Sequence, residues 1–389
     1  MSSLVPDGWS WHKLKDSLNS RPKSKLLSGE SDPRGYYDFY VCSKKILKSF
    51  HNEHSSPSIL LSTGGEAAVH LANEHYSFST DVWATVFKGQ VCNDYVFRLL
   101  EKNIKTINYL GFQGSGIRHL DKYFIEKLEF PIPPLPEQKK IASILTSVDE
   151  VIENTQKQID KLQDLKKATM NELLTKGIGH TEFKDSELGR IPKSWEVKSL
   201  SEISELSRGK FSHRPRNDPA FYDGRYPFLQ TGDIPIDNLE ITSFSQSLNE
   251  KGLQVSRLFP EGTLILTIAA TVGEVGYLTF DSCFPDSLVG ISTNQALVRQ
   301  YFMLFCLRYR KQELILEASE SAQKNLNLDI LNPFQVVVPT LDEQRAIESI
   351  LVSIQNQIDE KNNKLSQTQF LKKSLMQDLL TGKVRVTMT

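Results

Sequence analysis

The sequence predicts an α+β fold: two mixed α/β domains separated by two long helices that form an antiparallel coiled coil, with an internal pseudo-twofold duplication. The first observation is a repeat, because residues 135–175 recur as residues 341–381. The shift from Leu135 to Leu341 is 206 positions without a gap, which is typical of a duplicated domain, since solenoid repeats have much shorter periods. The second observation is a heptad pattern inside each copy, and the third is a segment of mixed strand and helix signals before each copy.

Both copies of the repeat are predicted to be long helices. Apolar residues alternate at spacings of four and three, the seam of a coiled coil. Proline precedes each copy, and beyond Pro136 in the first turn neither copy contains Pro or Gly. The other copy is the simplest partner for each seam, and separate packing of each helix on its own globular neighbour is the alternative. The predicted seam positions are 141, 145, 148, 152, 155, 159, 162, 166, 169 and 173, and 347, 351, 354, 358, 361, 365, 368, 372, 375 and 379.

The duplication extends into the segments before the helices. Trp9 and Leu14 recur as Trp195 and Leu200, a shift of 186 positions, so the second globular segment is longer than the first. We therefore expect the order domain, helix, domain, helix. The predicted parts are residues 1–133, 134–178, 179–339 (with a linker at its start) and 340–389.

Short runs rich in β-branched and aromatic residues predict strands in both globular segments. Two further runs predict helices in equivalent places of the two segments. The predicted strands are 36–41, 59–61, 82–87, 226–230, 263–269 and 288–292, and the predicted helices are 94–101 and 300–312.

Composition indicates an ordinary globular protein, with 39% hydrophobic and 24% charged residues in 389. The first residues lack the pattern of a secretory signal, and no run of about 18 apolar residues predicts a membrane span. Four scattered cysteines without a C-x-x-C pair predict reduced thiols, so we expect a cytoplasmic protein. The net charge of −1 predicts that any nucleic-acid binding depends on local basic patches.

Two basic loops are the strongest local candidates for such patches. S-R-x-K occurs at residues 20–23 and again at residues 207–210, about a dozen residues after Trp9 and Trp195. Lysine and arginine neutralise phosphates, and arginine also makes bidentate contacts to guanine. Solvated surface loops without a ligand are the alternative. A second repeated basic position, Arg118 in the first segment and Lys324 in the second, precedes the last strand of each segment. The predicted DNA-binding residues are Arg21, Lys23, Lys25, Arg118, Arg208, Lys210, Arg214, Arg216 and Lys324.

No motif predicts catalysis or a bound metal. Residues 112–116 (FQGSG) have the spacing of an S-adenosylmethionine loop, and residues 218–221 (DPAF) are similar to a methyltransferase motif. Such a glycine loop must end a strand and open a helix inside an α/β sheet, whereas residue 116 is followed closely by the proline-rich approach to the first long helix. No phosphate-binding loop, H-E-x-x-H pair or nucleophile elbow occurs. We therefore predict a non-enzyme with no catalytic residues, no metal and no cofactor of its own.

Three blocks carry a resemblance to a known family: residues 183–200 (FKDSELGRIPKSWEVKSL), 133–145 (PPLPEQKKIASIL) and 338–351 (VPTLDEQRAIESIL). Together with the terminal LLTKGI and LLTGKV strings, they resemble specificity subunits of type I restriction–modification enzymes over the whole chain. The resemblance implies that each globular segment is a target recognition domain reading one half of a split double-stranded DNA sequence. The paired helices would set the spacing between the half-sites.

The resemblance also implies partners. Two methyltransferase subunits would dock on the helices, and two restriction subunits would join them. S-adenosylmethionine, ATP and Mg²⁺ are expected only on those partner subunits. Because the two segments differ in sequence, the half-sites should differ too. We assign the repeated start of each helix to the subunit interface: Glu137, Gln138, Ile141 and Leu145, and Glu343, Gln344, Ile347 and Leu351.

Two other functions remain open at this point. The first is a coiled-coil scaffold without sequence-specific DNA binding, and the second is a methyltransferase in its own right. DNA binding by the chain with its partner, and S-adenosylmethionine binding by the chain alone, distinguish these from the specificity subunit.

Overall fold

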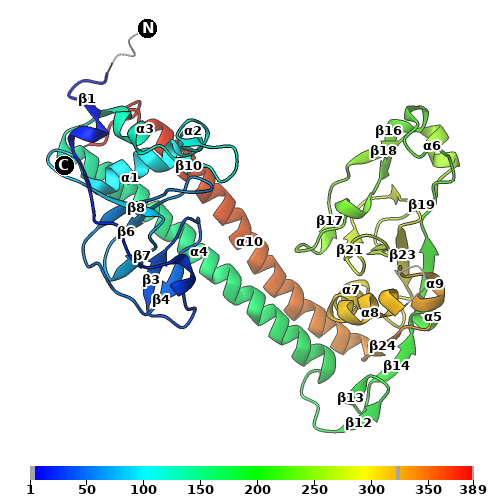
Figure 1. The fold of residues 1–389 in the computed structure, drawn as a ribbon. Helices are drawn as coiled ribbons and strands as arrows, with labels where there is room; N and C mark the ends of the chain where they lie inside the picture. The colour runs from blue at the N-terminus through cyan, green and yellow to red at the C-terminus, as the bar shows by residue number, and fades with distance from the viewer. Residues whose placement is uncertain (1–4, 321–324, 388–389) are drawn as a thin grey trace. The chain divides into compact units, whose positions relative to one another are not determined.

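A computed structural model describes residues 5–320 and 325–387 of the chain (Figure 1). The chain divides into two compact units, which are described separately. Unit 1 comprises Met1–Thr155 with Lys364–Thr389, and unit 2 comprises Gln156–Asn363. The division passes through both long helices, because each unit takes half of each helix into its core. The boundaries that we expected at 133/134, 178/179 and 339/340 follow the order of the chain, and they stay a prediction.

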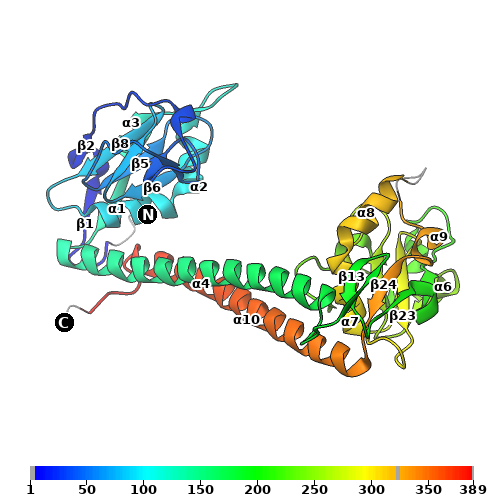
Figure 2. The same cartoon turned by 90° about the horizontal axis from the view of Figure 1, so that it is seen from below.

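Unit 1 is built on two small sheets. The larger sheet has the order β2-β8-β5-β6 and is antiparallel throughout (Figure 2). The smaller one has the order β4-β3-β7, with β3 antiparallel to β4 and parallel to β7. A third pair, β1 with β11, lies where the chain enters and leaves the domain. The strands are β1 Ser10–Lys13, β2 Leu18–Ser20, β3 Tyr37–Tyr40, β4 Leu47–Ser49, β5 Ser58–Ser62, β6 Val69–Ala72, β7 Tyr76–Phe78, β8 Val82–Phe87, β9 Phe112–Gln113, β10 His119–Leu120 and β11 Glu129–Ile132.

The core of unit 1 joins this domain to both long helices. Buried Trp9 and Tyr95 belong to the same apolar cluster as Ile141 at the start of α4 and Leu379 at the end of α10. Burial of apolar surface is the main favourable term in folding, so these helix ends are part of the domain. The helices are α1 Asn93–Lys102, α2 Ile104–Leu110, α3 Lys122–Lys127 and α4 Leu135–Thr175, with short 3₁₀ turns at Leu14–Asp16 and Ser28–Glu30.

Unit 2 repeats the same topology with additions. Its larger sheet has the order β15-β23-β20-β21-β17, and its first four strands pair antiparallel as β2, β8, β5 and β6 do. Its second sheet, β18-β16-β22-β19, again has one antiparallel and one parallel neighbour for its central strand β16. The strands are β12 Phe183–Ser186, β13 Gly189–Pro192, β14 Glu196–Ser199, β15 Ser204–Arg208, β16 Tyr222–Phe228, β17 Glu240–Ile241, β18 Gln246–Leu248, β19 Leu258–Phe259, β20 Leu264–Thr267, β21 Val275–Leu278, β22 Ser282–Cys283, β23 Leu288–Thr293 and β24 Gln335–Val338.

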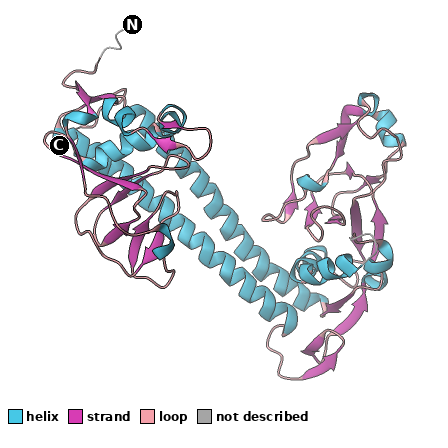
Figure 3. Cartoon of the chain, in the orientation of Figure 1, coloured by secondary structure: helices cyan, strands magenta, loops and turns pink. Residues whose placement is uncertain are grey.

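The added strands β17 and β19 agree with the greater length expected for the second segment. The core of unit 2 likewise includes Leu174 at the end of α4 and Ile347 near the start of α10, together with fully buried Trp195. Both units mix helices and strands (Figure 3), which confirms the predicted α+β class. The helices are α5 Leu200–Ile203, α6 Glu250–Gln254, α7 Gln300–Tyr309, α8 Lys311–Glu320, α9 Leu328–Leu331 and α10 Leu341–Leu379, with 3₁₀ turns at Pro219–Phe221 and Thr231–Asp233.

Several predicted elements have different bounds in the structure, and two of the differences concern where a helix ends. The single helix expected over residues 300–312 is broken at Arg310, which has non-helical backbone angles and separates α7 from α8. The Arg310 guanidinium donates to the Glu313 carboxylate, three residues later, and to the Gln335 carbonyl, which only the tertiary structure brings close. The second long helix ends at Leu379, and Gly382 follows with φ +70, the left-handed conformation that commonly terminates helices.

The long helices α4 and α10 pack together with antiparallel directions. In unit 1 the early residue Asp149 of α4 pairs with the late residue Lys372 of α10 at 2.8 Å. In unit 2 the late residue Lys166 of α4 bonds the early residue Gln355 of α10. All twenty predicted seam positions are buried or half-buried, which confirms the heptad assignment. Among residues 5–320 and 325–387, no helix is long and apolar enough to cross a membrane.

Candidate nucleic-acid interface

The two S-R-x-K loops lie at corresponding edges of the two larger sheets. Ser20 is the last residue of edge strand β2, and Arg208 is the last residue of edge strand β15. Edge strand β2 pairs with β8, which leads into α1, and edge strand β15 pairs with β23, which leads into α7. The structure therefore confirms that the repeated loops are topologically equivalent.

The first loop holds its arginine against a neighbouring turn. The Arg21 guanidinium donates from Nη2 to the Ser56 hydroxyl at 2.6 Å and from Nε to the Ser58 hydroxyl. Both partners are neutral hydroxyls, so neither of them offsets the positive charge of Arg21 at the sheet edge.

A small cavity brings a second and a third cation to this loop. Arg21, Lys23 and Lys122 line a cavity of about 240 Å³, with Asp81 as the lining carboxylate. Lys25 is exposed on the same loop. Lys122 was not among the predicted residues, because it is distant in sequence and only the packing of α3 brings it here.

In the second loop, two of the predicted arginines meet at one aspartate. Arg208 Nε donates to the Asp286 carbonyl at 2.5 Å, and Arg216 Nη2 lies 2.6 Å from the Asp286 carboxylate. The Arg216 and Asp286 side chains are both more than 40% exposed, so this ion pair is solvated and weak. A phosphate approaching the loop would compete with Asp286 for these guanidinium groups.

The remaining basic residues of the second loop have different surroundings. Arg214 Nη1 donates to the carbonyls of Phe211 at 2.7 Å and His213 at 2.8 Å, which holds the loop in shape. The His213 ring stacks on Phe221 with centroids 3.9 Å apart. Lys210 is exposed, so its ammonium group is accessible to an anion.

Arg118 has a structural environment. Its Nη2 donates to the Phe112 carbonyl at 2.8 Å and to the Asn108 carbonyl, so the half-buried side chain joins the end of α2 to β9. A contact from Arg118 to DNA stays a prediction. Lys324, its predicted counterpart, lies outside the residues that the structure describes.

The two glutamines assigned to the subunit interface are fully buried in this chain. Gln138 donates to the carbonyls of Gln90 at 2.8 Å and Pro133 at 2.9 Å, and it accepts from the Cys92 amide at 2.9 Å. Each glutamine therefore satisfies three backbone groups where a long helix leaves its domain.

Gln344 makes the same three contacts in unit 2. It donates to the carbonyls of Leu297 and Pro339, and it accepts from the Arg299 amide at 2.8 Å. The recurrence of this network identifies α1 and α7 as equivalent helices.

The two glutamates of the repeat bind the segment that follows the other helix. Glu137 pairs with Arg385 in unit 1, with N–O distances of 2.7 and 2.8 Å, and this bond raises the pKa of Arg385. In unit 2, Glu343 accepts from the Trp195 indole at 2.9 Å and lies 2.8 Å from His180 Nε2. Each glutamate therefore connects the chain after one long helix to the start of the other.

The four apolar residues assigned to the subunit interface are 0% exposed: Ile141, Leu145, Ile347 and Leu351. In the isolated chain they contact its own cores. Their role in subunit docking, like that of the four polar residues, stays a prediction.

The described residues contain no group of three His, Cys, Asp or Glu side chains that could hold a metal ion. The cysteines Cys42, Cys92, Cys283 and Cys306 are free thiols. Burial raises the pKa of the Cys306 and Cys283 thiols, which disfavours the reactive thiolate at these two positions.

Comparison with known proteins gives consistent results. The type I restriction modification DNA specificity domain matches this chain twice, over residues 6–164 and 192–368. The chain is 29% identical to the type I restriction enzyme MjaVIII specificity subunit of Methanocaldococcus jannaschii, over 98% of this chain and 94% of that protein. It is 23% identical to the EcoBI specificity subunit of Escherichia coli, over 75% of this chain and 65% of that protein.

A solved structure shares the fold over the whole length. The S subunit of a type I restriction–modification system from M. genitalium superposes with a TM-score of 0.71 at 16% identity, covering 100% of this chain and 99% of that one. The two matched domains, together with the repeated topology of the two units, lead to one conclusion: the chain belongs to the family of type I restriction–modification specificity subunits.

Proposed function

We propose that unit 1 and unit 2 each read one half of a bipartite, asymmetric DNA target. The chain is a specificity subunit of a type I restriction–modification system, and such subunits recognise DNA without being catalytic. The finer statement, one half-site for each globular domain, is our proposal. Because the two domains have the same topology and different loop sequences, we expect the half-sites to differ in sequence.

The observation that carries this proposal is the pair of basic loops at corresponding sheet edges. An internal pseudo-twofold repeat suits double-stranded DNA, whose two strands are also related by twofold symmetry. Arg21 and Lys23 in unit 1, and Arg208, Lys210 and Arg216 in unit 2, supply local positive charge on a chain of net charge −1. Phosphate neutralisation by such residues supplies most of the affinity for DNA.

The long helices are proposed to set the spacing between half-sites. α4 has 41 residues and α10 has 39, which corresponds to about 60 Å at 1.5 Å per residue. At about 3.4 Å per base pair this length limits the separation of half-sites to well under 20 base pairs, by order of magnitude.

We further propose two methyltransferase subunits and two restriction subunits as partners. The methyltransferase subunits would bind S-adenosylmethionine, and the restriction subunits would bind ATP and Mg²⁺. Several large apolar side chains on the long helices are more than a third exposed and offer a docking surface. They are Val151, Leu165, Ile350, Phe370 and Leu371.

The proposed DNA contact is tested by removing the exposed cations of the second loop. The double variant Arg208→Ala with Lys210→Ala should weaken DNA binding by the chain assembled with its methyltransferase partner. It should also reduce the slope of log affinity against log salt by about 2, since each lost phosphate contact removes roughly 0.9. Fluorescence anisotropy across a salt series measures both quantities.

A matched control removes two exposed cations of unit 2 outside the loop, Lys184→Ala with Lys193→Ala. For this control, the slope of log affinity against log salt should equal that of the parent chain within error. Unaltered binding by the Arg208/Lys210 variant would remove this loop from the interface. If the assembled parent chain bound genomic fragments no better than its partner alone, the scaffold function would replace DNA reading.

A further inference from the structure

Unit 1 contains a neutral ionic cluster where α1 meets the two long helices. Lys372 Nζ lies 2.6 Å from Glu101 and 2.8 Å from Asp149. Arg98, whose side chain is 4% exposed, pairs with Glu101 at 3.0 Å and also with Asp149. Two cations and two carboxylates balance one another, so no charge remains for a ligand.

The same four positions in unit 2 carry different charges. The helix repeat relates residues of α4 and α10 by 206 positions, and α1 corresponds to α7 with a shift of 207, from Asn93 to Gln300. The equivalents of Lys372, Asp149, Glu101 and Arg98 are therefore Lys166, Gln355, Arg308 and Phe305. Both carboxylates are lost, and one of them is replaced by a cation.

The two cations at these positions have neutral partners. Lys166 Nζ donates to the Gln355 side-chain oxygen at 2.5 Å. Arg308 donates to backbone carbonyls, with Val275 at 2.6 Å and Pro235 at 3.1 Å. Within the described chain no carboxylate lies within ion-pair distance of either group. Burial, with the charge of Arg308 as a second cause, lowers the pKa of Lys166 to about 8.

These cations line a large cavity of unit 2. Its volume is about 890 Å³, within the range of about 300–1,000 Å³ typical of small-molecule sites. The apolar part of its wall consists of Met170, Ile236 and Ile358, and Tyr309 also lines the cavity.

The remaining charged groups do not neutralise this pair. Lys311 is bonded to Glu274 at 2.5 Å, and Lys167 and Asp164 also line the cavity. Asp237 at the wall, and Asp359 beside Gln355, act on Lys166 only at longer range. The lining thus has four cations and three carboxylates.

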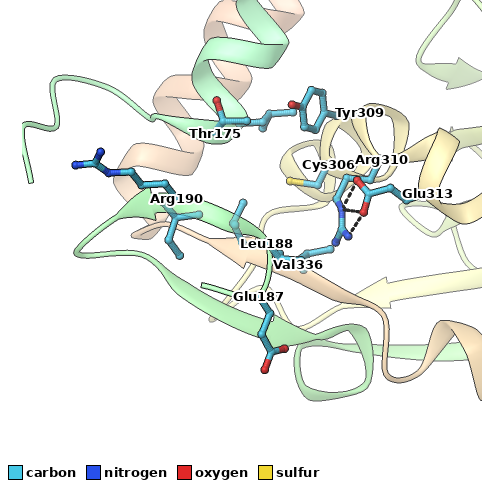
Figure 4. A pocket seen from close by; sticks show the side chains of 12 residues that line it. Thr175, Glu187, Leu188, Arg190, Cys306, Tyr309, Arg310, Glu313 and Val336 are labelled. Atoms are coloured by element: carbon cyan, nitrogen blue, oxygen red, sulfur yellow. Dashed lines mark hydrogen bonds and ion pairs between the residues drawn. The ribbon is translucent and has the colours of Figure 1, made fainter. Parts of the chain in front are cut away.

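A second cavity of unit 2 gives a useful contrast. It has a volume of about 440 Å³, and its wall contains Arg310 and Glu313. Figure 4 shows the Arg310 guanidinium turned onto the Glu313 carboxylate, and the two groups are 3.0 Å apart at Nε. This cation is already paired with a carboxylate, as Lys372 is in unit 1.

We propose that the 890 Å³ cavity between α4, α10 and α7 binds a small organic anion, with its charged head between Lys166 and Arg308 and an apolar body against Met170, Ile236 and Ile358. The head is a carboxylate or a phosphate, both of which arginine and lysine recognise by charge-assisted hydrogen bonds. This site goes beyond DNA recognition and does not depend on it. A bound ligand would connect the helix pair to the domain and stabilise unit 2.

The test is isothermal calorimetry of the full chain with phenyl phosphate and with phenylacetate as probes. At least one probe should bind saturably with one site, and the better probe identifies the head group. Inorganic phosphate and benzyl alcohol, which each carry half of the ligand chemistry, should bind about tenfold more weakly or not at all, since a hydrogen bond to a charged group and a buried ring each contribute about that factor.

Two variants and one control locate the binding. Lys166→Met removes a cation, and Gln355→Glu restores the carboxylate that Asp149 supplies in unit 1. Each should weaken binding about tenfold or more, while exposed Lys161→Met on the same helix should bind as the parent chain does. Circular dichroism confirms that each variant is folded, and the isosteric Gln355→Glu change keeps the test informative if Lys166→Met unfolds.

Three results would overturn the proposal. They are absence of saturable binding at millimolar probe, parent-like affinity in both the Lys166→Met and the Gln355→Glu variant, and affinity for inorganic phosphate equal to that for the better phenyl probe. Competitive acetylation of Lys166 followed by mass spectrometry adds a direct readout, because a bound probe should protect this lysine. Protection by the methyltransferase subunit, with none by either probe, would assign the cavity to a protein contact and also overturn the small-anion proposal.

Discussion

A buried glutamine lies where each globular domain ends and a long helix begins, Gln138 at α4 and Gln344 at α10. Each amide bonds three backbone groups at the point where the chain leaves its last strand. A buried backbone group without a partner is costly, and an apolar side chain cannot replace the amide. Glutamine therefore recurs at these two positions because its amide provides hydrogen-bond partners for buried backbone groups, whatever other contacts the helix makes.

Substitution of these glutamines is predicted to destabilise the unit in which each lies. Gln138→Leu leaves two carbonyls and one amide without partners, and we expect a loss of at least about 2 kcal/mol in the free energy of unfolding. Chemical denaturation followed by circular dichroism measures it. The control is Gln158→Leu at an exposed position of α4, which should change stability by less than about 0.5 kcal/mol. Equal effects of the two variants would contradict this account.

Lys166 predicts a pH dependence of stability. Its folded-state pKa is lowered to about 8 from 10.5, so between these values the unfolded chain binds more protons than the folded one. The stability contributed by this residue therefore rises with pH across that window. Below about pH 8 both states are protonated, and the full cost of the buried charge remains.

Comparison with Lys166→Met isolates this contribution. The variant should be more stable than the parent near neutral pH, and the difference should shrink as pH rises from about 8 to about 10.5. Denaturant midpoints at several pH values measure the difference. Lys161→Met serves as the control, with an offset independent of pH. A constant difference for Lys166→Met would show that its ammonium is not desolvated.

At the scale of the elements, α4 and α10 are organised by one seam. Their twenty predicted seam positions are all at least half-buried, although Lys166 and Lys372 are among them. Lys372 is tolerated because Glu101 and Asp149 bind it, and Lys166 because Gln355 accepts from it and its side chain is only half-buried. A lysine therefore occupies the apolar seam in both units, and it is bound by carboxylates in unit 1 and by a neutral amide in unit 2.

Lengthening both helices is predicted to change the DNA target. A seven-residue insertion after Lys161 in α4, matched by one after Glu360 in α10, keeps the heptad register and adds about 10 Å. The spacer between half-sites should then grow by about three base pairs. Methylome sequencing of a host carrying the assembled enzyme reads the spacer directly. An unchanged spacer with retained methylation would contradict the proposed ruler.

At the scale of the whole molecule, each unit combines one globular domain with halves of both long helices. In each unit the segment that follows one long helix binds the start of the other, as Arg385 binds Glu137 in unit 1 and His180 binds Glu343 in unit 2. Each unit is thus assembled from sequence-distant parts, so either one should be lost as a whole when its part of α4 or α10 is removed.

The purified chain is predicted to have neither methyltransferase nor nuclease activity. Family membership assigns it to the non-catalytic subunit. Incubation of the chain with tritiated S-adenosylmethionine and unmethylated DNA should incorporate no more label into DNA than a blank without protein. Addition of the methyltransferase subunit should raise the incorporation above this background. Incorporation by the chain alone, retained after further purification, would contradict the prediction.

The sequence by itself determined the periodic and repeated features of this protein. The heptad seams, the order domain–helix–domain–helix and strands such as β8 Val82–Phe87 follow from local patterns of apolar residues, and the resemblance of residues 133–145 and 338–351 led to the family. These properties depend on the spacing of residues along the chain and not on contacts between distant segments. The repeat also singled out Glu137 and Glu343, without indicating which residues they contact in the chain.

Only the tertiary structure decided what each singled-out residue contacts. Asp286 lies far in sequence from Arg208 and Arg216, Lys122 from Arg21, and Arg308 from Lys166, so no local pattern could pair them. At the split of the predicted helix, the Arg310 guanidinium likewise bonds the carbonyl of Gln335, which is distant in sequence. Long-range packing sets these contacts, because burial and charge at each position depend on which distant segments fold against it.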